Sequence, residues 1–370
     1  MKNILDSNPI LVEEWIDKIK PIKAKSIKTG KKIKLFDITT KLSSRGNVDY
    51  GVIIEKDKII FNFITKAVGQ HNFPPAIKNL QIKDQAKIDF NEKNIEGFRP
   101  EHLSLSPFPK TLNKDLFRQF WTPKFSNHQG KFGLPTSVYS PDTRYNFNDT
   151  AFPWCTCGKV EVSGGWGSGV MIGPRHLMTA SHAINWGNNN TAGWVKFTPS
   201  YFDGSAPFGF AYATKIYSWS QVNGSDGVDT NESAFNYVVC VLDSRIGDLT
   251  GWMGSKGYST DWNGSAYWSH IGYPSDMAGG QRPSFIGDGV IDSTDNGSSS
   301  GRTSLMMSHK IDVIPGQSGG PFFGWWDREE WPRVVGIQST EQFGGSNGPN
   351  TCGGGNPLAE LINYVRTVEP

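Results

Sequence analysis

Two short segments of the chain carry a histidine and a serine of the kind used in nucleophilic catalysis. Residues 179–182 read TASH and end on His182, and residues 316–321 read GQSGGP around Ser318. A serine hydroxyl is a poor nucleophile at neutral pH, so it needs a neighbouring base and donors that hold the oxyanion that forms. We predict His182 as the base and Ser318 as the nucleophile. The glycines around Ser318 permit a tight turn, which would aim the amides of Gly316 and Ser318 at one oxygen as an oxyanion hole.

The composition changes so strongly near residue 130 that the chain divides into two parts. Up to residue 130 there are 23 Lys and Arg against 14 Asp and Glu, a formal charge of +9, whereas the remainder carries −7. Only 6 of the 42 glycines lie in the first part. A length of 370 residues allows two or three folding units. We predict a lysine-rich N-terminal unit over residues 1–105, a connector over 106–136 and a second domain over 137–370.

The N-terminal unit has the pattern of a small α+β structure. Residues 11–22 place apolar side chains at near-helical spacing, residues 32–38 alternate lysine with apolar residues as a half-buried strand does, and residues 50–63 predict a hairpin that turns at 55–58. We interpret the lysines as a solvated face. Because the interleaved aromatic and glycine residues of an RNA-binding surface are absent, no nucleic-acid partner is predicted.

The second domain is predicted to be all-β. Short apolar runs rich in β-branched residues, such as 169–172, 237–242 and 334–337, are separated by Gly, Asn, Ser and Pro, a pattern typical of a barrel or sandwich. The exception is 357–367, where apolar side chains recur on one helical face, so the chain is expected to end in an amphipathic helix.

These motifs, in this order, resemble those of the chymotrypsin-like serine proteases. The resemblance rests on residues 167–172 and 177–182, on the run Asn236-Tyr237-Val238-Val239, and on residues 316–321. Residues 141–144 and 148–153 are similar to the start of the mature glutamyl-endopeptidase-like enzymes of the staphylococcal and bacillar type. The likeness covers 137–370 and implies two six-stranded antiparallel barrels, a catalytic site between them and protein or peptide substrates. No cofactor and no catalytic metal are predicted.

The chain departs from this family at the third catalytic position, where Asn236 stands in place of an aspartate. An asparagine can orient the imidazole of His182, but it cannot stabilise the imidazolium by charge and can lock the wrong tautomer. A change of this kind in a serine protease lowers turnover by about 10⁴. Three explanations are open: Asn236 is an inactivating change, a nearby carboxylate (Asp226, Asp229 or Glu232) reaches His182, or the domain has kept the fold as a binding module. We predict a serine endopeptidase with a weakened triad.

Specificity is expected to depend on four residues that the resemblance places at the substrate pocket. Asp312, six residues before Ser318, would lie at the base of the pocket and could receive Lys or Arg, although glutamyl-specific enzymes also have Asp there. Those enzymes carry Ser or Thr where this chain has Val313, and His where it has Gln338, next to Ser339. Both departures weaken the expectation of an acidic residue at the cleavage site. The structural alternative for Asp312 is a buried carboxylate paired for the fold.

The four cysteines, Cys155, Cys157, Cys240 and Cys352, leave two disulfides, free thiols or a structural zinc open. The resemblance implies a secreted zymogen whose N-terminal unit is a pro-segment that docks on the protease domain and is cut near 135–139. A fused adaptor domain is the alternative for this unit. The first 20 residues lack the apolar core of a signal peptide, so a removed signal, another export route or a cytoplasmic location are the alternatives. No run of residues is apolar and long enough to span a membrane.

Overall fold

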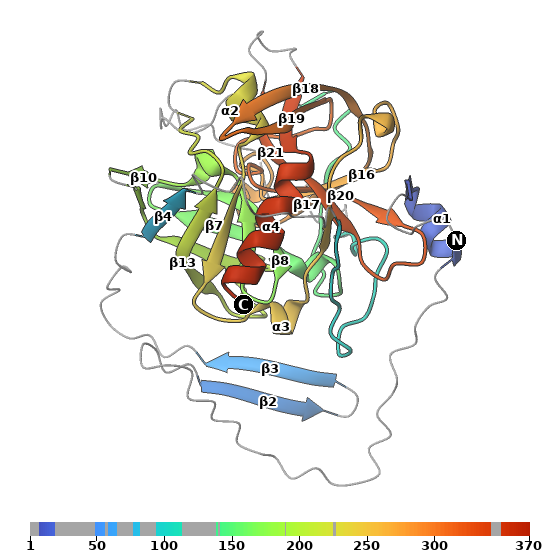
Figure 1. Cartoon of the computed structure of the whole chain (residues 1–370). Helices are drawn as coiled ribbons and strands as arrows, with labels where there is room; N and C mark the ends of the chain where they lie inside the picture. Colours follow the sequence, from blue (N-terminus) through green and yellow to red (C-terminus); the bar gives the residue numbers. More distant parts are fainter. Residues whose placement is uncertain are drawn as a thin grey trace.

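The computed structural model describes residues 7–18, 49–55, 58–64, 77–81, 94–112, 138–139, 141–188, 190–224, 227–341 and 349–370. The strand predicted at 32–38 lies outside these residues, as does most of the predicted connector. The structure is mostly β, and two sheets account for nearly all described strands (Figure 1).

The first sheet closes into a six-stranded antiparallel barrel. Its order is β13-β12-β7-β8-β9-β14, and β14 pairs back onto β13. In β14, Val238, Cys240 and Leu242 pack inside this barrel, whereas Val239 and Val241 pack into the core outside it. Burial on both faces explains why this strand is an unbroken apolar run. The strands are β7 (Cys157–Val162), β8 (Gly165–Gly173), β9 (His176–Thr179), β12 (Val195–Pro199), β13 (Ala211–Ser218) and β14 (Val238–Leu242).

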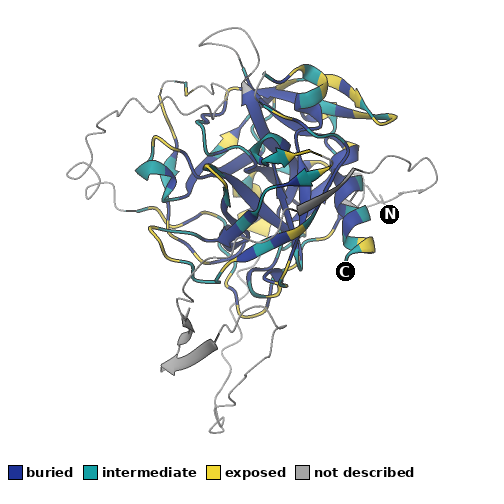
Figure 2. Ribbon diagram, turned by 90° about the vertical axis from the view of Figure 1, so that its left-hand side faces the viewer, coloured by how far each residue is buried: buried dark blue, intermediate teal, exposed yellow. Residues whose placement is uncertain are grey.

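The second barrel follows the order β17-β16-β20-β21-β22-β19-β18. Only Val290 separates β17 from β18, so these two form one bent strand that joins the ends of the sheet. Both barrels have largely buried strands (Figure 2), and the predicted two-barrel, all-β fold is confirmed. The strands are β16 (Trp268–Gly272), β17 (Ser284–Gly289), β18 (Ile291–Ser299), β19 (Arg302–His309), β20 (Pro321–Trp326), β21 (Arg333–Glu341) and β22 (Asn350–Gly354).

The predicted C-terminal helix is confirmed as α4 (Asn356–Val368). Its apolar face, formed by Leu358, Leu361, Ile362 and Val365, is fully buried in the core cluster that also takes in the outer face of β14. The helix contacts strands of both barrels, as Figure 1 shows in red, so it holds the two barrels together.

Short elements complete the described chain. The helices are α2 (Thr230–Ala234) and α3 (Gly247–Thr250), with single 3-10 turns η3 (Trp154–Thr156), η4 (Ser181–Ala183), η5 (Thr260–Trp262) and η6 (Ala278–Gly280). The remaining strands of 138–370 are β6 (Tyr145–Asn146), β10 (Trp186–Gly187), β11 (Thr191–Ala192) and β15 (Gly254–Lys256).

Within residues 1–105, the predicted hairpin is confirmed as β2 (Asp49–Glu55) and β3 (Lys58–Ile64), which form a two-stranded sheet of their own. The other strands pair with the barrels. β4 (Ile77–Gln81) lies between β11 and β13 of the first sheet, and β5 (Asn94–Ile95) pairs with β15 of the second. These segments are therefore bonded into the sheets of the following domain, and the boundaries 1–105, 106–136 and 137–370 stay predictions.

Residues 7–18 lie against the C-terminal end of β20 in the second barrel. β1 (Pro9–Ile10) pairs with β20, and the helix predicted at 11–22 is described as α1 (Val12–Lys18). Trp15 is buried, its ring centroid is 3.8 Å from that of Trp325, and its indole nitrogen donates to the carbonyl of Glu329 at 2.9 Å. We call residues 7–18 the N-terminal arm.

All four cysteines are buried free thiols, so of the arrangements that the sequence left open, the two disulfides are wrong. Cys155 and Cys157 lie close in sequence, yet Cys240 and Cys352 pack in separate apolar clusters, one in each barrel. Burial raises the pKa of Cys157 and Cys240 to about 12, which keeps both thiols protonated and unreactive at neutral pH.

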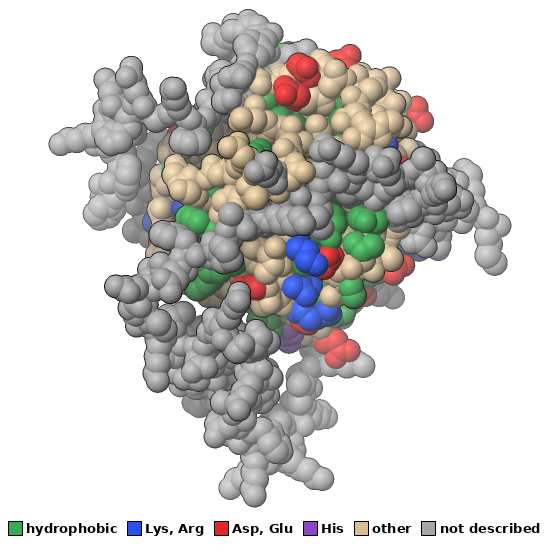
Figure 3. Space-filling model, turned by 60° about the vertical axis from the view of Figure 1, so that its left-hand side comes forward, with side chains coloured by type: hydrophobic (Ala, Val, Ile, Leu, Met, Phe, Trp, Pro, Cys, Tyr) green, Lys and Arg blue, Asp and Glu red, His purple; other side chains and the backbone are tan. Residues whose placement is uncertain are grey.

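None of the helices among the described residues has the length and apolar character that a membrane crossing needs. On the face drawn in Figure 3, a small group of Lys and Arg side chains lies beside acidic ones, and most of the described surface is neither charged nor hydrophobic. This face therefore presents no extended basic surface of described residues.

Candidate active site

The predicted catalytic residues are contributed by both barrels. His182 lies in η4, directly after β9, and Asn236 lies between α2 and β14. Because β14 pairs with β9 in the register Val238↔Thr179, the two side chains approach each other. Ser318 precedes β20 of the second barrel, and Ser339 lies in β21 beside it.

The Asn236 carboxamide is fully buried and contacts His182 twice. Its Oδ1 accepts the backbone N–H of His182 at 2.9 Å, and its Nδ2 is 2.8 Å from the imidazole Nδ1. The Nδ2 also donates to the hydroxyl of Ser339 at 2.7 Å. Only an oxygen can accept the backbone N–H, so this contact selects the orientation in which the amide nitrogen faces the ring.

This orientation decides where the imidazole proton resides. When Nδ2 donates to Nδ1 of His182, the ring nitrogen Nδ1 is the acceptor and the proton lies on Nε2. Removal from water lowers the pKa of His182 to about 4, and the hydrogen bond with Asn236 offsets this only in part. The ring is therefore neutral at pH 7, in the tautomer opposite to the one a general base needs on its serine side.

Two of the three alternative carboxylates, Asp229 and Glu232, bond to each other's backbone and not to His182. Asp229 caps α2: its side chain accepts the N–H of Glu232, and the Glu232 side chain accepts the N–H of Asp229. Asp226 lies outside the described residues. Asn236 is therefore the group that faces the second ring nitrogen.

Two glycines set the shape of the loop that carries Ser318. Gly316 and Gly319 have φ of 100° and 86°, values that disfavour any residue with a side chain. A Cβ on Gly319 would lie 2.3 Å from the Thr179 hydroxyl and 2.8 Å from the Ala180 amide, so this loop packs directly against the segment that ends at His182. The two catalytic segments predicted from sequence are thus neighbours across the barrels.

Ser168 of β8 braces the same loop and was not identified from the sequence. Its amide donates to the carbonyl of Ser318 at 2.8 Å, its hydroxyl donates to the carbonyl of Gly316 at 2.7 Å, and that hydroxyl accepts the amide of Tyr273 at 2.9 Å. With the carbonyls held in this way, the amides of Gly316 and Ser318 have no acceptor among the described residues. These are the two amides predicted for the oxyanion hole.

Asp312 faces the chain segment before the first barrel. Its Oδ1 accepts the amide of Tyr139 at 2.6 Å and its Oδ2 accepts the amide of Thr143 at 3.2 Å. Burial raises its pKa, and these two hydrogen bonds lower it. Asp312 thus has the contacts expected of a carboxylate that is paired for the fold. Val313, the next residue, is fully buried. The substrate contact of both residues stays a prediction.

Gln338 has a buried side chain whose orientation is set by a histidine. The Nδ1 of His309 accepts the amide of Ile311 at 3.2 Å, so its Nε2 carries the proton and donates to Oε1 of Gln338 at 3.0 Å. The Nε2 amide of Gln338 is then left without a partner among the described residues. Sequence reasoning noted Gln338 but not His309, which is 29 residues away.

Arg144 was noted in the sequence only as part of a family-like segment, yet its side chain reaches the Ser318 loop. It is 1% exposed and forms ion pairs with Asp142 and Asp276. It also donates to Oε1 of Gln317, the residue before Ser318, at 3.0 Å. A buried arginine has no simple sequence signal, because its burial depends on two carboxylates, one of which is 132 residues away.

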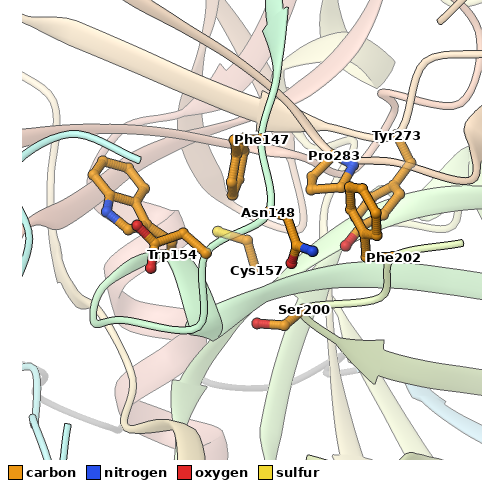
Figure 4. A pocket seen from close by; sticks show the side chains of 9 residues that line it. Phe147, Asn148, Trp154, Cys157, Ser200, Phe202, Tyr273 and Pro283 are labelled. Carbon is orange, nitrogen blue, oxygen red and sulfur yellow. The ribbon is translucent and has the colours of Figure 1, made fainter. Parts of the chain in front are cut away.

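A small pocket lies apart from these residues (Figure 4). It is lined by Asn148, Ser200 and Phe202, with Tyr273 and Pro283 on the side of the second barrel. None of the predicted catalytic or substrate-binding residues lines it. Among the described residues, no cluster of His, Cys, Asp and Glu suits a metal ion.

Comparison with known proteins places this geometry in a family context. No protein-family model matches the chain. A glutamyl endopeptidase of Bacillus licheniformis is 25% identical over 201 residues, which cover 54% of this chain and 58% of the relative. The chain thus matches little more than half the length of that curated protein.

A solved structure shows the same fold. The structure of Glu endopeptidase in complex with MPD has a TM-score of 0.51 at 19% identity and covers 62% of this chain and 99% of that chain. A thermostable serine protease, AL20, from an extremophilic microorganism has a TM-score of 0.44 at 19% identity, with 58% and 99% covered. The chain has the chymotrypsin-like serine protease fold and is similar to the glutamyl-endopeptidase group within it.

Proposed function

We propose that this protein is a serine endopeptidase. The observation that carries the proposal is the packing of the Ser318 loop against the His182 segment, with Asn236 bonded to the imidazole and with two free amides at Gly316 and Ser318 among the described residues. This is the set of groups that acyl transfer needs: nucleophile, base, orienting group and oxyanion donors.

In the proposed reaction, the Ser318 hydroxyl attacks the scissile carbonyl while its proton passes to Nε2 of His182. The amides of Gly316 and Ser318 hold the oxyanion. The C–N bond then breaks, the leaving amine takes the proton from His182, and water hydrolyses the acyl-enzyme by the same steps in reverse order. The substrate is a protein or peptide.

We propose that Asn236 weakens this reaction through the tautomer of His182. Proton transfer from Ser318 requires a lone pair on Nε2, but the amide nitrogen of Asn236 holds the proton on that atom. In the active tautomer, the proton of His182 is on Nδ1. Asn236 must then rotate its amide, so that its oxygen no longer accepts the backbone N–H of His182, or it must keep its orientation, so that two N–H donors face each other. Either state is disfavoured, so only a small fraction of molecules is competent.

The same observation favours a second candidate, a binding module that has the protease fold and no useful turnover. A fluorophosphonate probe distinguishes the two, because it labels a serine only where the nucleophile is activated. We expect slow labelling at Ser318 in the natural chain, fast labelling in Asn236→Asp, and none in Ser318→Ala. If Asn236→Asp is not labelled either, the binding module is correct.

For the residue on the acyl side of the cleaved bond, we propose a side chain with a neutral hydrogen-bond acceptor, such as glutamine. The support is the unpartnered Nε2 amide of Gln338, which is a donor without charge. Burial lowers the pKa of His309 to about 3, so His309 is neutral at pH 7 and supplies no charge for a glutamate. A substrate carbonyl oxygen would satisfy the buried donor.

We also propose that the N-terminal segment stays docked on the protease domain, as the contacts of β1, β4 and β5 with the barrels suggest. A pro-segment that is cut off would break these ladders. By its resemblance to the glutamyl-endopeptidase group, we place the protein outside the cell. Quantifying it in culture medium and in cell lysate tests this location, and recovery in the lysate alone would support the cytoplasmic alternative.

A further inference from the structure

The guanidinium of Arg144 is saturated with hydrogen bonds beside the nucleophile loop. Nε and Nη2 donate to the two oxygens of Asp142 at 3.0 and 2.9 Å, and Nη1 and Nη2 donate to those of Asp276 at 3.3 and 2.6 Å. The fifth hydrogen bond goes from Nη1 to Oε1 of Gln317 at 3.0 Å. An arginine has five N–H donors in a rigid plane, so every one of them has a partner and the group is held in one position.

The side chain of Gln317 connects the fixed guanidinium to the backbone of the loop. Its Oε1 also accepts the amide of Ile314 at 3.0 Å, and its own amide donates to the carbonyl of Ile314 at 3.1 Å. This backbone hydrogen bond closes a four-residue turn over 314–317, in which Pro315 is the second residue and Gly316 the third. The φ of 100° at Gly316 is that of a type II turn. The direction of the Pro315–Gly316 peptide in this turn decides where the Gly316 amide points.

The segment that carries Arg144 is itself fixed on the second barrel. The Arg144 amide donates to Asp142 at 3.0 Å, the next two residues form β6 against β17, and the amide of Thr143 donates to Asp312. The charge of the buried guanidinium is compensated by Asp142 and Asp276, whose side chains are 39% and 40% exposed. Arg144 is therefore part of a rigid support and not a mobile surface group.

We propose that Arg144 is a positioning residue for the oxyanion hole: through Gln317 it holds the turn 314–317 in the form that aims the Gly316 and Ser318 amides at one point. This rests on the proposed endopeptidase function. A lysine at this position would keep the charge but has three donors on one atom, so it cannot hold both carboxylates and Gln317 in plane.

The test uses the full chain in the Asn236→Asp background, where the labelling rate is high enough to measure. We expect Arg144→Lys to lower the rate of fluorophosphonate labelling and kcat for a peptide by about 10- to 100-fold, since loss of an oxyanion donor costs about 10²- to 10³-fold. KM should change by less than about threefold, because the turn acts on the transition state.

The matched control is Arg333→Lys, which changes another buried arginine that is paired with a carboxylate, Glu329, away from the site. It should lower the thermal midpoint to a similar extent and leave the labelling rate within about twofold. If the two variants lose labelling equally, or if Arg144→Lys labels like its parent, the role of Arg144 is overturned and the endopeptidase function stands. If the Asn236→Asp parent is not labelled, both fail.

A milder variant covers the case in which Arg144→Lys does not fold. Asp276→Asn changes a half-exposed side chain and removes the charge from one of the two anchors of the guanidinium. We expect a smaller decrease in labelling, about 3- to 10-fold, with kcat again reduced more than KM is changed. A labelling rate equal to that of the parent would contradict the proposal.

Discussion

The side chain of Asn236 spans the backbone and the ring of His182, with Oδ1 on the main-chain N–H at 2.9 Å and Nδ2 on the imidazole Nδ1 at 2.8 Å. A carboxylate in the same place would accept both N–H groups. The carboxamide can accept only one, and it uses its oxygen for the backbone. In the proposed reaction, the imidazole is consequently left in the tautomer that cannot take a proton from Ser318.

Replacing Asn236 with aspartate should restore the base. The carboxylate would accept the Nδ1 proton of His182, free Nε2 and raise the pKa of the ring from about 4, because it places a negative charge within hydrogen-bond distance. We expect kcat for a peptide substrate to rise by about 10³- to 10⁴-fold, with little change in KM. Steady-state kinetics over pH 5 to 9 measures both effects.

Asp229→Asn and Glu232→Gln are the matched controls for that variant. These side chains cap α2 and do not face the imidazole, so their replacement should leave kcat unchanged and cost at most about 1 kcal/mol of stability. A large loss of activity in either variant would mean that a carboxylate of α2 reaches His182 during turnover.

Cleavage of peptides that differ only in the residue before the cut should reveal the role of Gln338. In the Asn236→Asp protein, we expect kcat/KM for Gln to exceed that for Glu, Lys and Leu by about 10-fold or more. Gln338→Leu should remove this advantage while cleavage of the Leu peptide is retained. A preference for Lys or Arg would instead support Asp312 as the specificity residue.

The barrels and the terminal helix could be predicted because their signals are local. The apolar runs at 169–172 and 334–337 lie within strands, and the run at 237–242 covers β14 and the one residue before it. The helical face of 357–367 is the buried face of α4. These patterns arise from burial, which a single segment records in its own sequence.

The residues that support the site, Ser168 and Arg144, could not be predicted, because most of their contacts are with residues far away in the sequence. Ser168 acts through its own amide and hydroxyl, and Arg144 acts through carboxylates and an amide that lie 2, 132 and 173 residues away. The packing of the first barrel on the second brings Ser168 to the Ser318 loop, and the pairing of β6 with β17 brings Arg144 to its partners. The same holds for β4, which pairs with β11 and β13, two strands that come much later in the chain.

The protein should lose stability steeply as the pH falls from about 6.5 to about 4. Burial lowers the pKa of His176 and His182 to about 4 and that of His270 and His309 to about 3. In this range the unfolded chain binds protons at these four positions and the folded chain does not, so protonation favours unfolding. Each histidine contributes up to about 1.4 kcal/mol per pH unit. Urea unfolding between pH 4.5 and 8 gives the slope.

His270→Gln should reduce that slope by about one proton. Above pH 7 both the folded and the unfolded forms have neutral imidazoles, so none of these histidines should contribute to the pH dependence there. An equal slope in the wild type and in His270→Gln would show that His270 is charged in the folded state.

Trp15 should be the residue that holds the N-terminal arm on the second barrel. It is 2% exposed, its ring contacts that of Trp325 at a tilt, and it donates to the carbonyl of Glu329. The indole of Trp326 in turn donates to the carbonyl of Ser7. Trp15→Ala should weaken docking of the arm by about 3 kcal/mol or more, since it leaves a cavity and an unpaired carbonyl. Hydrogen exchange of residues 7–18 should become fast while the barrel amides stay protected.

Leu11→Ala, which changes a side chain of the same arm that is 37% exposed, should leave protection within about 1 kcal/mol of the wild type. Equal loss of protection in the arm and in the barrels would mean that the arm and the domain unfold as one unit.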